Sequence, residues 1–301
     1  MKNSSPVCMS SGQISVIDNG SVIPINGALL VPPYRRAYLV KEIHFSCASP
    51  TSATLLTGAN LQAAQHFVEV QLTLGGQKAL TRDFVPIGMF APTVHSEAEF
   101  YLGGQGQSAN QYSMWSSFRW TFPRPMYVQA GDGIVPQVRS NRLGTNGTFL
   151  FYMSVVGEVL PPEAKVPDTS CVPYVQTYRN NKVVASISEA RQLENPFNDR
   201  PLYCQRFIGR SYLDNGNGIL TPESFPAAGP PIIVITDQDR FPITNPSGVP
   251  FATAFEQRSH SLEHRRALTP KQWVQVKFLS GGDSTRVYYV SMIGYREEAL
   301  N

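Results

Sequence analysis

Short stretches of alternating polar and apolar residues, closed by clusters of Gly, Pro, Asn or Asp, run through almost the whole chain. Residues 66–74 (HFVEVQLTL) alternate with a period of two and end at Gly75-Gly76, and residues 13–18 (QISVID) precede Asn19-Gly20. A period of two places one face of a strand in a core and the other in water. The pattern predicts an all-β protein. We expect strands at 13–18, 21–25, 38–45, 66–74, 84–90, 112–122, 126–130, 133–139, 148–159, 172–178, 183–187, 202–213, 232–236, 240–244, 252–258, 272–279 and 285–295.

Helical patterns are few and short. Residues 186–195 (SISEARQLEN) are the best candidate, because Ser186 and Glu189 have the spacing of a capping box and Pro196 would end the helix. Residues 60–66 and 261–267 are further candidates for short helices.

The composition fits a β-rich globular protein with two domains. At roughly 150 residues per domain, 301 residues suggest two domains. Only 16% of the residues are charged, against about 25% in ordinary soluble domains, and 11% are aromatic. A coiled coil and a disordered chain are excluded, because the first needs abundant Ala, Glu, Lys and Leu and the second lacks aromatic residues. The stretch 160–168 (LPPEAKVPD) has three prolines and three charged residues and predicts a linker close to Pro162.

An internal repeat links the two halves. Residues 148–157 read TFLFYMSVVG and residues 285–294 read TRVYYVSMIG, so that Thr, Tyr, Ser and Gly coincide without gaps. Upstream, residues 127–129 (YVQ) match residues 273–275 (WVQ), and Gly-Asp turns follow at Gly131-Asp132 and Gly282-Asp283. Two blocks in the same order indicate a duplication, although unrelated strands can mimic one another. Each half then holds about eight strands, which favours a jelly roll or another sandwich.

With these paired halves and the repeated strands at 148–157 and 285–294, the chain resembles a known family. It is similar to the double jelly-roll major capsid proteins of tailless, icosahedral, membrane-containing viruses, the lineage that includes adenovirus hexon. The resemblance spans about residues 13–300 and is greatest to the compact versions found in bacteriophages. It implies two tandem eight-stranded jelly rolls with a few short helices in loops. We expect a flexible N-terminal arm at 1–12, a first jelly roll at 13–160, and a linker with the second jelly roll at 161–301.

The resemblance also implies a function. The expected protein is a structural major capsid protein, not an enzyme, that self-assembles as pseudo-hexagonal homotrimers into an icosahedral virion shell over an internal membrane. It would be made in the host cytoplasm, and its partners would be itself, neighbouring capsomers and minor capsid or vertex proteins. The N-terminal arm is expected at the inner membrane. The alternative is a carbohydrate-binding β-sandwich, lectin-like or receptor-binding on a phage. A duplicated cupin-type enzyme is weaker, because the five histidines do not provide its His-rich metal cluster.

The net charge and the cysteines argue against two further classes of protein, a nucleic-acid-binding protein and a disulfide-bonded one. A net charge of +3 is too small for a nucleic-acid-binding protein, which normally carries a clustered basic face, so no specific nucleic-acid partner is expected. The four cysteines form no CxxC pair and indicate free thiols made in a reducing compartment. The N-terminus has no apolar signal-peptide core, and no stretch approaches 18 uninterrupted apolar residues.

Each candidate for chemistry has a simpler explanation, so no catalytic, cofactor or metal residue is predicted. The histidines are His44, His66, His95, His260 and His264. The last two would share a helix face but form no HExxH motif. Asp237 with Asp239, and His95 with Glu97 and Glu99, are more simply polar turns and exposed strand faces. The glycines at 103, 104 and 106 are not followed by Lys-Ser/Thr, so they form no phosphate loop.

Aromatic residues crowd one stretch, at Tyr112, Trp115, Phe118, Trp120 and Phe122. They would suit a sugar-stacking platform if they shared an exposed face. Trp115 is out of phase with Phe118 and Trp120, so aromatic side chains lie on both faces of the expected strand. This favours a strand buried between a core and a subunit interface.

Overall fold

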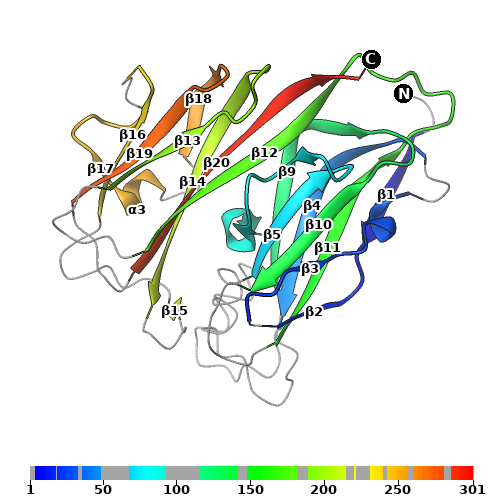
Figure 1. Cartoon of the computed structure of the whole chain (residues 1–301), viewed down its shortest axis with the longest axis horizontal. Helices are drawn as coiled ribbons and strands as arrows, with labels where there is room; N and C mark the ends of the chain where they lie inside the picture. Colours follow the sequence, from blue (N-terminus) through cyan, green and yellow to red (C-terminus); the bar gives the residue numbers. More distant parts are fainter. Residues whose placement is uncertain are drawn as a thin grey trace. The chain divides into compact units, whose positions relative to one another are not determined.

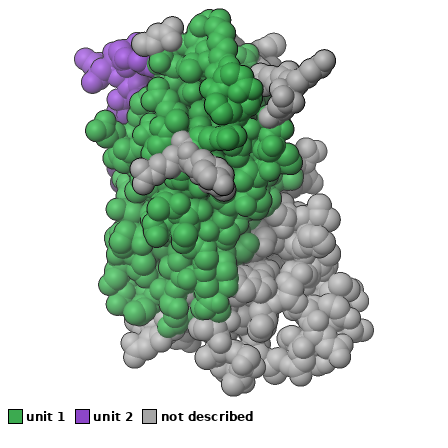
Figure 2. Space-filling model, turned by 90° about the vertical axis from the view of Figure 1, so that its right-hand side faces the viewer, with its two compact units in different colours: residues 1–172, 298–301 green, residues 173–297 purple. Residues whose placement is uncertain are grey.

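The computed structural model describes residues 4–17, 19–32, 36–48, 68–92, 115–140, 148–181, 189–214, 220–221, 231–239, 243–255, 260–280 and 286–300. Within these ranges the chain is nearly all β, and no helix reaches seven residues. The chain divides into two compact units (Figures 1 and 2). Unit 1 contains residues 1–172 and 298–301, and unit 2 contains residues 173–297.

Unit 1 contains two antiparallel sheets. One has the strand order β1-β11-β4-β9-β8, with β2 also paired to β11; the other has the order β3-β10-β5-β6, with β7 also paired to β5. The strands are β1 Ser5–Ser10, β2 Ile14–Ile17, β3 Ile23–Pro24, β4 Tyr38–Ala48, β5 Val68–Leu74, β6 Lys78–Ala79, β7 Val85–Pro86, β8 Ala91–Pro92, β9 Trp115–Val128, β10 Ile134–Ser140 and β11 Thr148–Val159. The described part of unit 1 also contains two 3-10 turns, η1 Gly27–Leu30 and η3 Ile87–Met89.

Unit 2 repeats this plan, and its described residues include one helical turn, α3 Phe251–Ala254. Its sheets have the orders β12-β20-β14-β15, with β18 also paired to β14, and β13-β19-β16-β17. The strands are β12 Thr169–Asn181, β13 Glu189–Glu194, β14 Leu202–Asp214, β15 Leu220–Thr221, β16 Ile232–Asp237, β17 Val249–Pro250, β18 His260–Leu268, β19 Trp273–Ser280 and β20 Arg286–Ala299. The first residues of β12 and the last of β20 belong to unit 1.

The core of each unit lies between its two sheets, because alternate residues of facing strands are buried. In unit 1, β10 buries every second residue from Ile134 onward, and Phe45 of β4 lies 6.4 Å from Phe151 of β11 between ring centroids. In unit 2, Phe278 of β19 and Tyr288 of β20 join the two sheets, with ring centroids 5.5 Å apart. Burial of such apolar surface is the main force that holds each sandwich together.

Eight strands of one unit correspond in order to eight strands of the other. The run β1-β11-β4-β9 matches β12-β20-β14-β18, and the run β3-β10-β5-β7 matches β13-β19-β16-β17. The predicted repeat at 148–157 and 285–294 falls on β11 and β20, which are matching strands. The duplication predicted from these segments is therefore visible in the topology.

Matching bulges fix this correspondence residue by residue. The β4 register jumps between Val40 and Glu42, and the β14 register jumps between Cys204 and Arg206. The last glycine of each repeat lies beside its bulge, with Gly157 opposite Val40 and Gly294 opposite Cys204. A Cβ at Gly294 would lie 2.5 Å from the carbonyl oxygen of Tyr203, and one at Gly157 would overlap that of Leu39. Both glycines are required by close backbone approach.

A second repeat escaped the sequence comparison. In unit 1 the Leu72 amide donates to Thr81 Oγ1 at 3.1 Å, and the Thr81 amide donates to the Leu72 carbonyl at 3.2 Å. In unit 2 the same reciprocal pair joins Ile235 and Thr244, at 3.0 and 3.2 Å. A Val-Pro strand follows each threonine, as β7 and β17. The signal was present as Leu80-Thr81 with Val85-Pro86 and Ile243-Thr244 with Val249-Pro250.

The two copies differ where their cores are filled. By the shared register, Phe45 of β4 and Gly209 of β14 are matching positions. Phe45 stacks on Phe90, with ring centroids 4.8 Å apart. In unit 2 the ring of Phe255 lies where a side chain at Gly209 would be. Phe90, which follows β7, therefore stacks on Phe45 in unit 1. Phe255, which follows β17, occupies the space left by the absent side chain of Gly209 in unit 2.

The upstream block of the predicted repeat is wrong. Residues 127–129 lie at the end of β9, whereas residues 273–275 begin β19, the counterpart of β10. The true match is between the turns before β10 and β19. The Asp132 amide donates to the Gln129 carbonyl at 3.1 Å, and the Gln272 amide donates to the Thr269 carbonyl at 3.0 Å. An aromatic-Val-Gln triplet is common strand composition and does not identify a particular strand.

Four further expectations need correction. Residues 5–10 of the expected flexible arm form β1, whose Ser5–Ser10 pairs with Ser154–Val159 of β11. The expected helix at 186–195 contains β13, and the expected helix at 261–267 lies within β18, because pairing with β19 and β14 outweighs local helix signals. The expected strand at 252–258 begins instead with α3. The expected helix at 60–66 and strand at 183–187 lie outside the described residues.

The expected linker, residues 160–168, contains no strand and lies between β11 and β12. The contact-based division of the chain falls between Val172 and Pro173. The jelly-roll bounds 13–160 and 161–301 remain a prediction. The strand β1 lies before residue 13, and the end of β20 belongs to unit 1.

Candidate functional site

Phe118, Trp120 and Phe122 of β9 lie in the core, as expected for one face of this strand, and the interface expected on its other face stays a prediction. Phe118, Trp120 and Phe122 point to one face at a spacing of two, and all three are buried. The Trp120 ring lies 5.3 Å from that of Phe90 and 5.1 Å from that of Phe122, measured between centroids. Between them Arg119 and Thr121 are exposed. These three rings therefore cannot form a sugar-stacking platform. Tyr112 and the side chain of Trp115 lie outside the described residues.

His44 belongs to a small charged cluster on the outward side of β4. Its Nε2 lies 2.8 Å from Glu42 Oε2, and Arg119 Nε of β9 lies 3.8 Å from the same oxygen. All three side chains are about a quarter to a half exposed, so the pairing contributes at most about 1 kcal/mol. It is an ion-pair cluster on a sheet surface.

A second charged cluster joins three strands. Glu158 of β11 pairs with Lys41 of β4 and accepts a hydrogen bond from Ser4, beside β1, at 3.1 Å. These two hydrogen bonds hold the pKa of the Glu158 carboxyl below its usual range. The cluster fastens the first strand of the unit to its neighbours.

The remaining sequence candidates do not converge. Asp237 ends β16 and Asp239 lies in the exposed turn after it. His260 and His264 lie on β18 instead of a helix, and their side chains are outside the described part. His66, His95, Glu97, Glu99 and glycines 103, 104 and 106 are also outside it. Among the residues that the structure describes, no three His, Cys, Asp or Glu side chains are grouped so that they could hold a metal ion.

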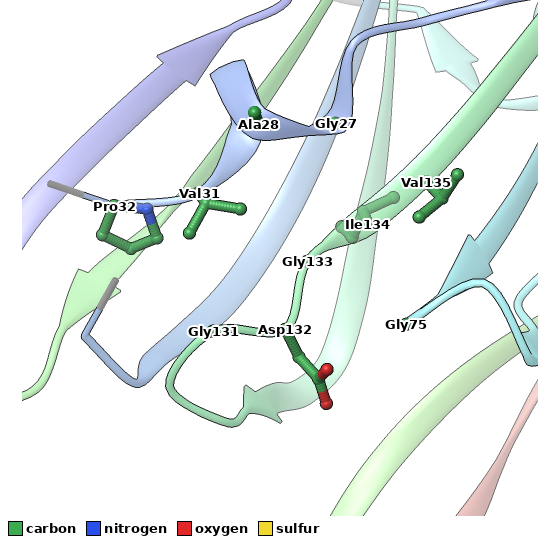
Figure 3. Close-up of a pocket in the computed structure, with 10 residues that line it drawn as sticks. All are labelled: Gly27, Ala28, Val31, Pro32, Gly75, Gly131, Asp132, Gly133, Ile134 and Val135. Atoms are coloured by element: carbon green, nitrogen blue, oxygen red, sulfur yellow. The ribbon is translucent and has the colours of Figure 1, made fainter. Parts of the chain in front are cut away.

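A hollow of about 510 Å³ opens beside the turn before β10 (Figure 3). Among its described lining residues only Asp132 is titratable; the others are Gly27, Ala28, Val31, Pro32, Gly75, Gly131, Gly133, Ile134 and Val135. Burial, and then the charge of Asp132, raise the pKa of the Tyr38 phenol behind this region. The described lining brings together no paired acid and base and no nucleophile with a base.

The thiols offer no reactive group at a site. Cys47, Cys171 and Cys204 are buried, and Cys8 on β1 is exposed. Burial raises the pKa of the Cys47 thiol, which keeps it protonated and unreactive.

None of the described helices is long and apolar enough to cross a membrane.

Unit 1 carries several exposed apolar side chains among its described residues. Leu29 and Val135 are 50% and 40% exposed, and Leu29 belongs to η1 beside the hollow that Val135 lines. Ile17 and Val22 are also exposed on this unit. Large apolar side chains in water carry a free-energy cost that contact with another surface removes. Sequence reasoning found no such surface, because exposure of single Leu or Val residues is set by tertiary structure.

Comparison with known proteins gives a fold. No protein-family model and no curated protein sequence matches the chain. The chain is similar to a protein in the atomic structure of Sulfolobus Turreted Icosahedral Virus, with a TM-score of 0.55, 13% identity, and coverage of 97% of this chain and 90% of that chain. For the crystal structure of the STIV MCP the TM-score is 0.53 and the identity is 12%, with coverage of 97% of this chain and 96% of that chain. For PBCV-1 VP54, fitted into a reconstruction of the virophage Sputnik, the TM-score is 0.51 and the identity is 8%, with coverage of 99% of this chain and 95% of that chain.

These similarities extend over both units, and the neighbours are double jelly rolls. The chain has the same fold: each unit holds two sheets with the matching strand orders described above. The double jelly roll expected from the sequence is confirmed.

Proposed function

We propose that the protein is a structural, non-enzymatic capsid protein that forms homotrimers, and that these trimers build an icosahedral virion shell over an internal membrane. Neighbouring trimers and minor capsid or vertex proteins are its proposed partners, and the host cytoplasm is the proposed place of synthesis. A specific nucleic-acid partner is not part of the proposal.

One observation carries the proposal. The similarity to the STIV MCP covers 97% of this chain and 96% of that chain, so both jelly rolls are matched together. A single jelly roll is compatible with many functions, because fold alone does not determine function. Two tandem jelly rolls in one chain, matched along their whole length to a capsid protein, are compatible with fewer functions and favour a capsid role.

Surface chemistry supports self-association. Charged residues are sparse, so little electrostatic repulsion opposes packing of many copies. The exposed side chains of Ile17, Val22, Leu29 and Val135 offer apolar contact on unit 1. The first twelve residues are the proposed contact with the internal membrane, and six of them form β1.

Electron microscopy of the purified protein tests the proposal. Three chains of 33.2 kDa give a particle of about 100 kDa, which we expect by light scattering and as pseudo-hexagonal particles or shells in negative stain. Monomers at high concentration, together with binding to immobilised glycans, would support the carbohydrate-binding alternative and contradict the capsid function. A Phe207→Asp variant, with its charge in the core of unit 2, is the control that should lose the particles with the fold.

A further inference from the structure

The last residues of the chain complete its first unit. Unit 1 is built from residues 1–172 and, after the whole of unit 2, from residues 298–301. Glu298 near the end of β20 pairs with Lys78 of β6, with 2.6 Å between Oε2 and Nζ. The Leu300 amide donates to the carbonyl of Asp168 at 3.1 Å. Two specific interactions thus hold the returning segment in unit 1.

Burial shows that the Glu298 contact is more than a surface ion pair. The Glu298 side chain is 8% exposed, whereas that of Lys78 is 48% exposed. A carboxylate that loses most of its water needs partners, so removal of Lys78 takes away a charge that compensates the buried carboxylate. The preceding residue, Glu297, is exposed and belongs to unit 2, and it provides a matched comparison on the same strand.

The other side of the returning segment is also anchored. Leu300 reaches Asp168, the residue before β12, and Ser170 on β12 bonds with the end of β9. The Tyr127 amide donates to Ser170 Oγ at 3.0 Å, and the Ser170 hydroxyl donates to the Tyr127 carbonyl at 3.4 Å. The segment is therefore connected to β9 through β12 and to β5 through β6.

We propose that residues 298–301 are a strap that closes unit 1 only after unit 2 has been made. Unit 1 cannot reach its final stability before then, since the residues that close it follow the whole of unit 2 in the sequence. The strap delays completion of the first unit until the second has been made. A shell protein benefits, because truncated chains would not present a finished first unit, but the strap itself does not depend on the capsid function.

Hydrogen exchange of the full-length, unassembled protein tests the strap. We expect Glu298→Gln and Lys78→Met to speed exchange of the amides of Gln77 and Leu80 by about fivefold or more, with β16 and β19 of unit 2 unchanged. Deletion of 298–301 should act in the same direction. Glu297→Gln is the control and should exchange as the wild type does. The double variant Lys78→Glu with Glu298→Lys should restore slow exchange.

The results that would overturn the strap are distinct. Wild-type exchange in both the deletion and Glu298→Gln would show that the segment does not stabilise unit 1. Equal acceleration in the two units would show a general loss of stability. Failure of the charge-reversed double variant to slow exchange would remove the ion pair from the proposal. Each measurement is made on unassembled protein, so failure of the capsid function would not change it.

Discussion

Gly157 and Gly294 occupy matching places because the backbone of the neighbouring strand leaves no room for a side chain. We predict that Gly157→Ala and Gly294→Ala each lower the free energy of unfolding by roughly 2 kcal/mol or more, since the added methyl group would meet carbonyl oxygens of Leu39 or Tyr203. Urea unfolding measures the loss. Ser154→Ala on β11 is the control and should change stability by less than about 0.5 kcal/mol. A Gly157→Ala variant as stable as Ser154→Ala would contradict the close approach.

The turns before β10 and β19 differ in one backbone position. Gly131 and Lys271 are matching residues, with φ of 90° and 66°, and Lys271 is the only described non-glycine residue with positive φ. This conformation costs a side-chain-bearing residue about 1–2 kcal/mol. We predict that Lys271→Gly raises stability by up to about 1 kcal/mol, after allowance for the more flexible unfolded chain.

The converse variant isolates the same strain. A Cβ at Gly131 would have no atom within 4 Å, so Gly131→Ala adds the backbone cost without a clash. We predict a loss of about 1 kcal/mol in the free energy of unfolding. Thermal unfolding of the two variants should shift in opposite directions. Shifts of the same sign would show that the φ angles do not control stability here.

At the scale of the element, β1 is part of the first sandwich and not a detachable arm. Its six residues pair with β11, Met9 is buried, and the Ser11 amide donates to the Met153 carbonyl at 2.8 Å. We predict that deletion of residues 1–12 lowers stability by several kcal/mol, because burial of Met9 alone contributes about 1.5–3 kcal/mol. Calorimetry of the purified protein measures the loss. Deletion of residues 1–3 should leave the unfolding temperature unchanged, and equal behaviour of both deletions would contradict the role of β1.

Elements rich in apolar and aromatic residues between turn-forming clusters could be predicted from the sequence. The expected ranges 66–74, 148–159 and 202–213 overlap β5, β11 and β14 closely, because β-branched and aromatic residues favour strands. The region of β13 could not, because Ser186, Glu189 and Pro196 imitate helix boundaries and its pairing with β19 depends on distant residues. The repeat at Thr81 and Thr244 is present in the sequence but is hard to align without a gap. The distance from the threonine to the proline of the following Val-Pro pair differs by one residue between the two copies.

The candidate site was less predictable than the fold. The sequence singled out Phe118, Trp120 and Phe122 for their chemistry, but only the fold decides that their shared face is the inner one. It gave no signal for Leu29 and Val135, which are separated by more than a hundred residues and become neighbours of one hollow through η1 and β10.

At the scale of the whole molecule, the proposed trimer should depend on apolar contact. At about 1 M NaCl the Debye length is about 3 Å, so surface ion pairs are screened. We predict that the trimer persists in light scattering at this salt concentration and that Leu29→Glu or Val135→Glu shifts it toward monomer. Glu163→Gln, in the linker, is the control. Separation into monomers by salt alone would show that charge holds the trimer together.

Different side chains fill the two cores at matching positions, so core residues cannot be exchanged singly between the two halves of this chain. Phe45 with Phe90 and Gly209 with Phe255 are matched pairs, so each partner is tolerated only with its own companion. A chimera that carried Phe from β4 into β14 would force its ring into that of Phe255, and the reverse exchange would leave a void beside Phe90. Since the duplication, the copies have become mutually incompatible at this point through epistasis, although their hydrogen-bonded frameworks still superimpose in register.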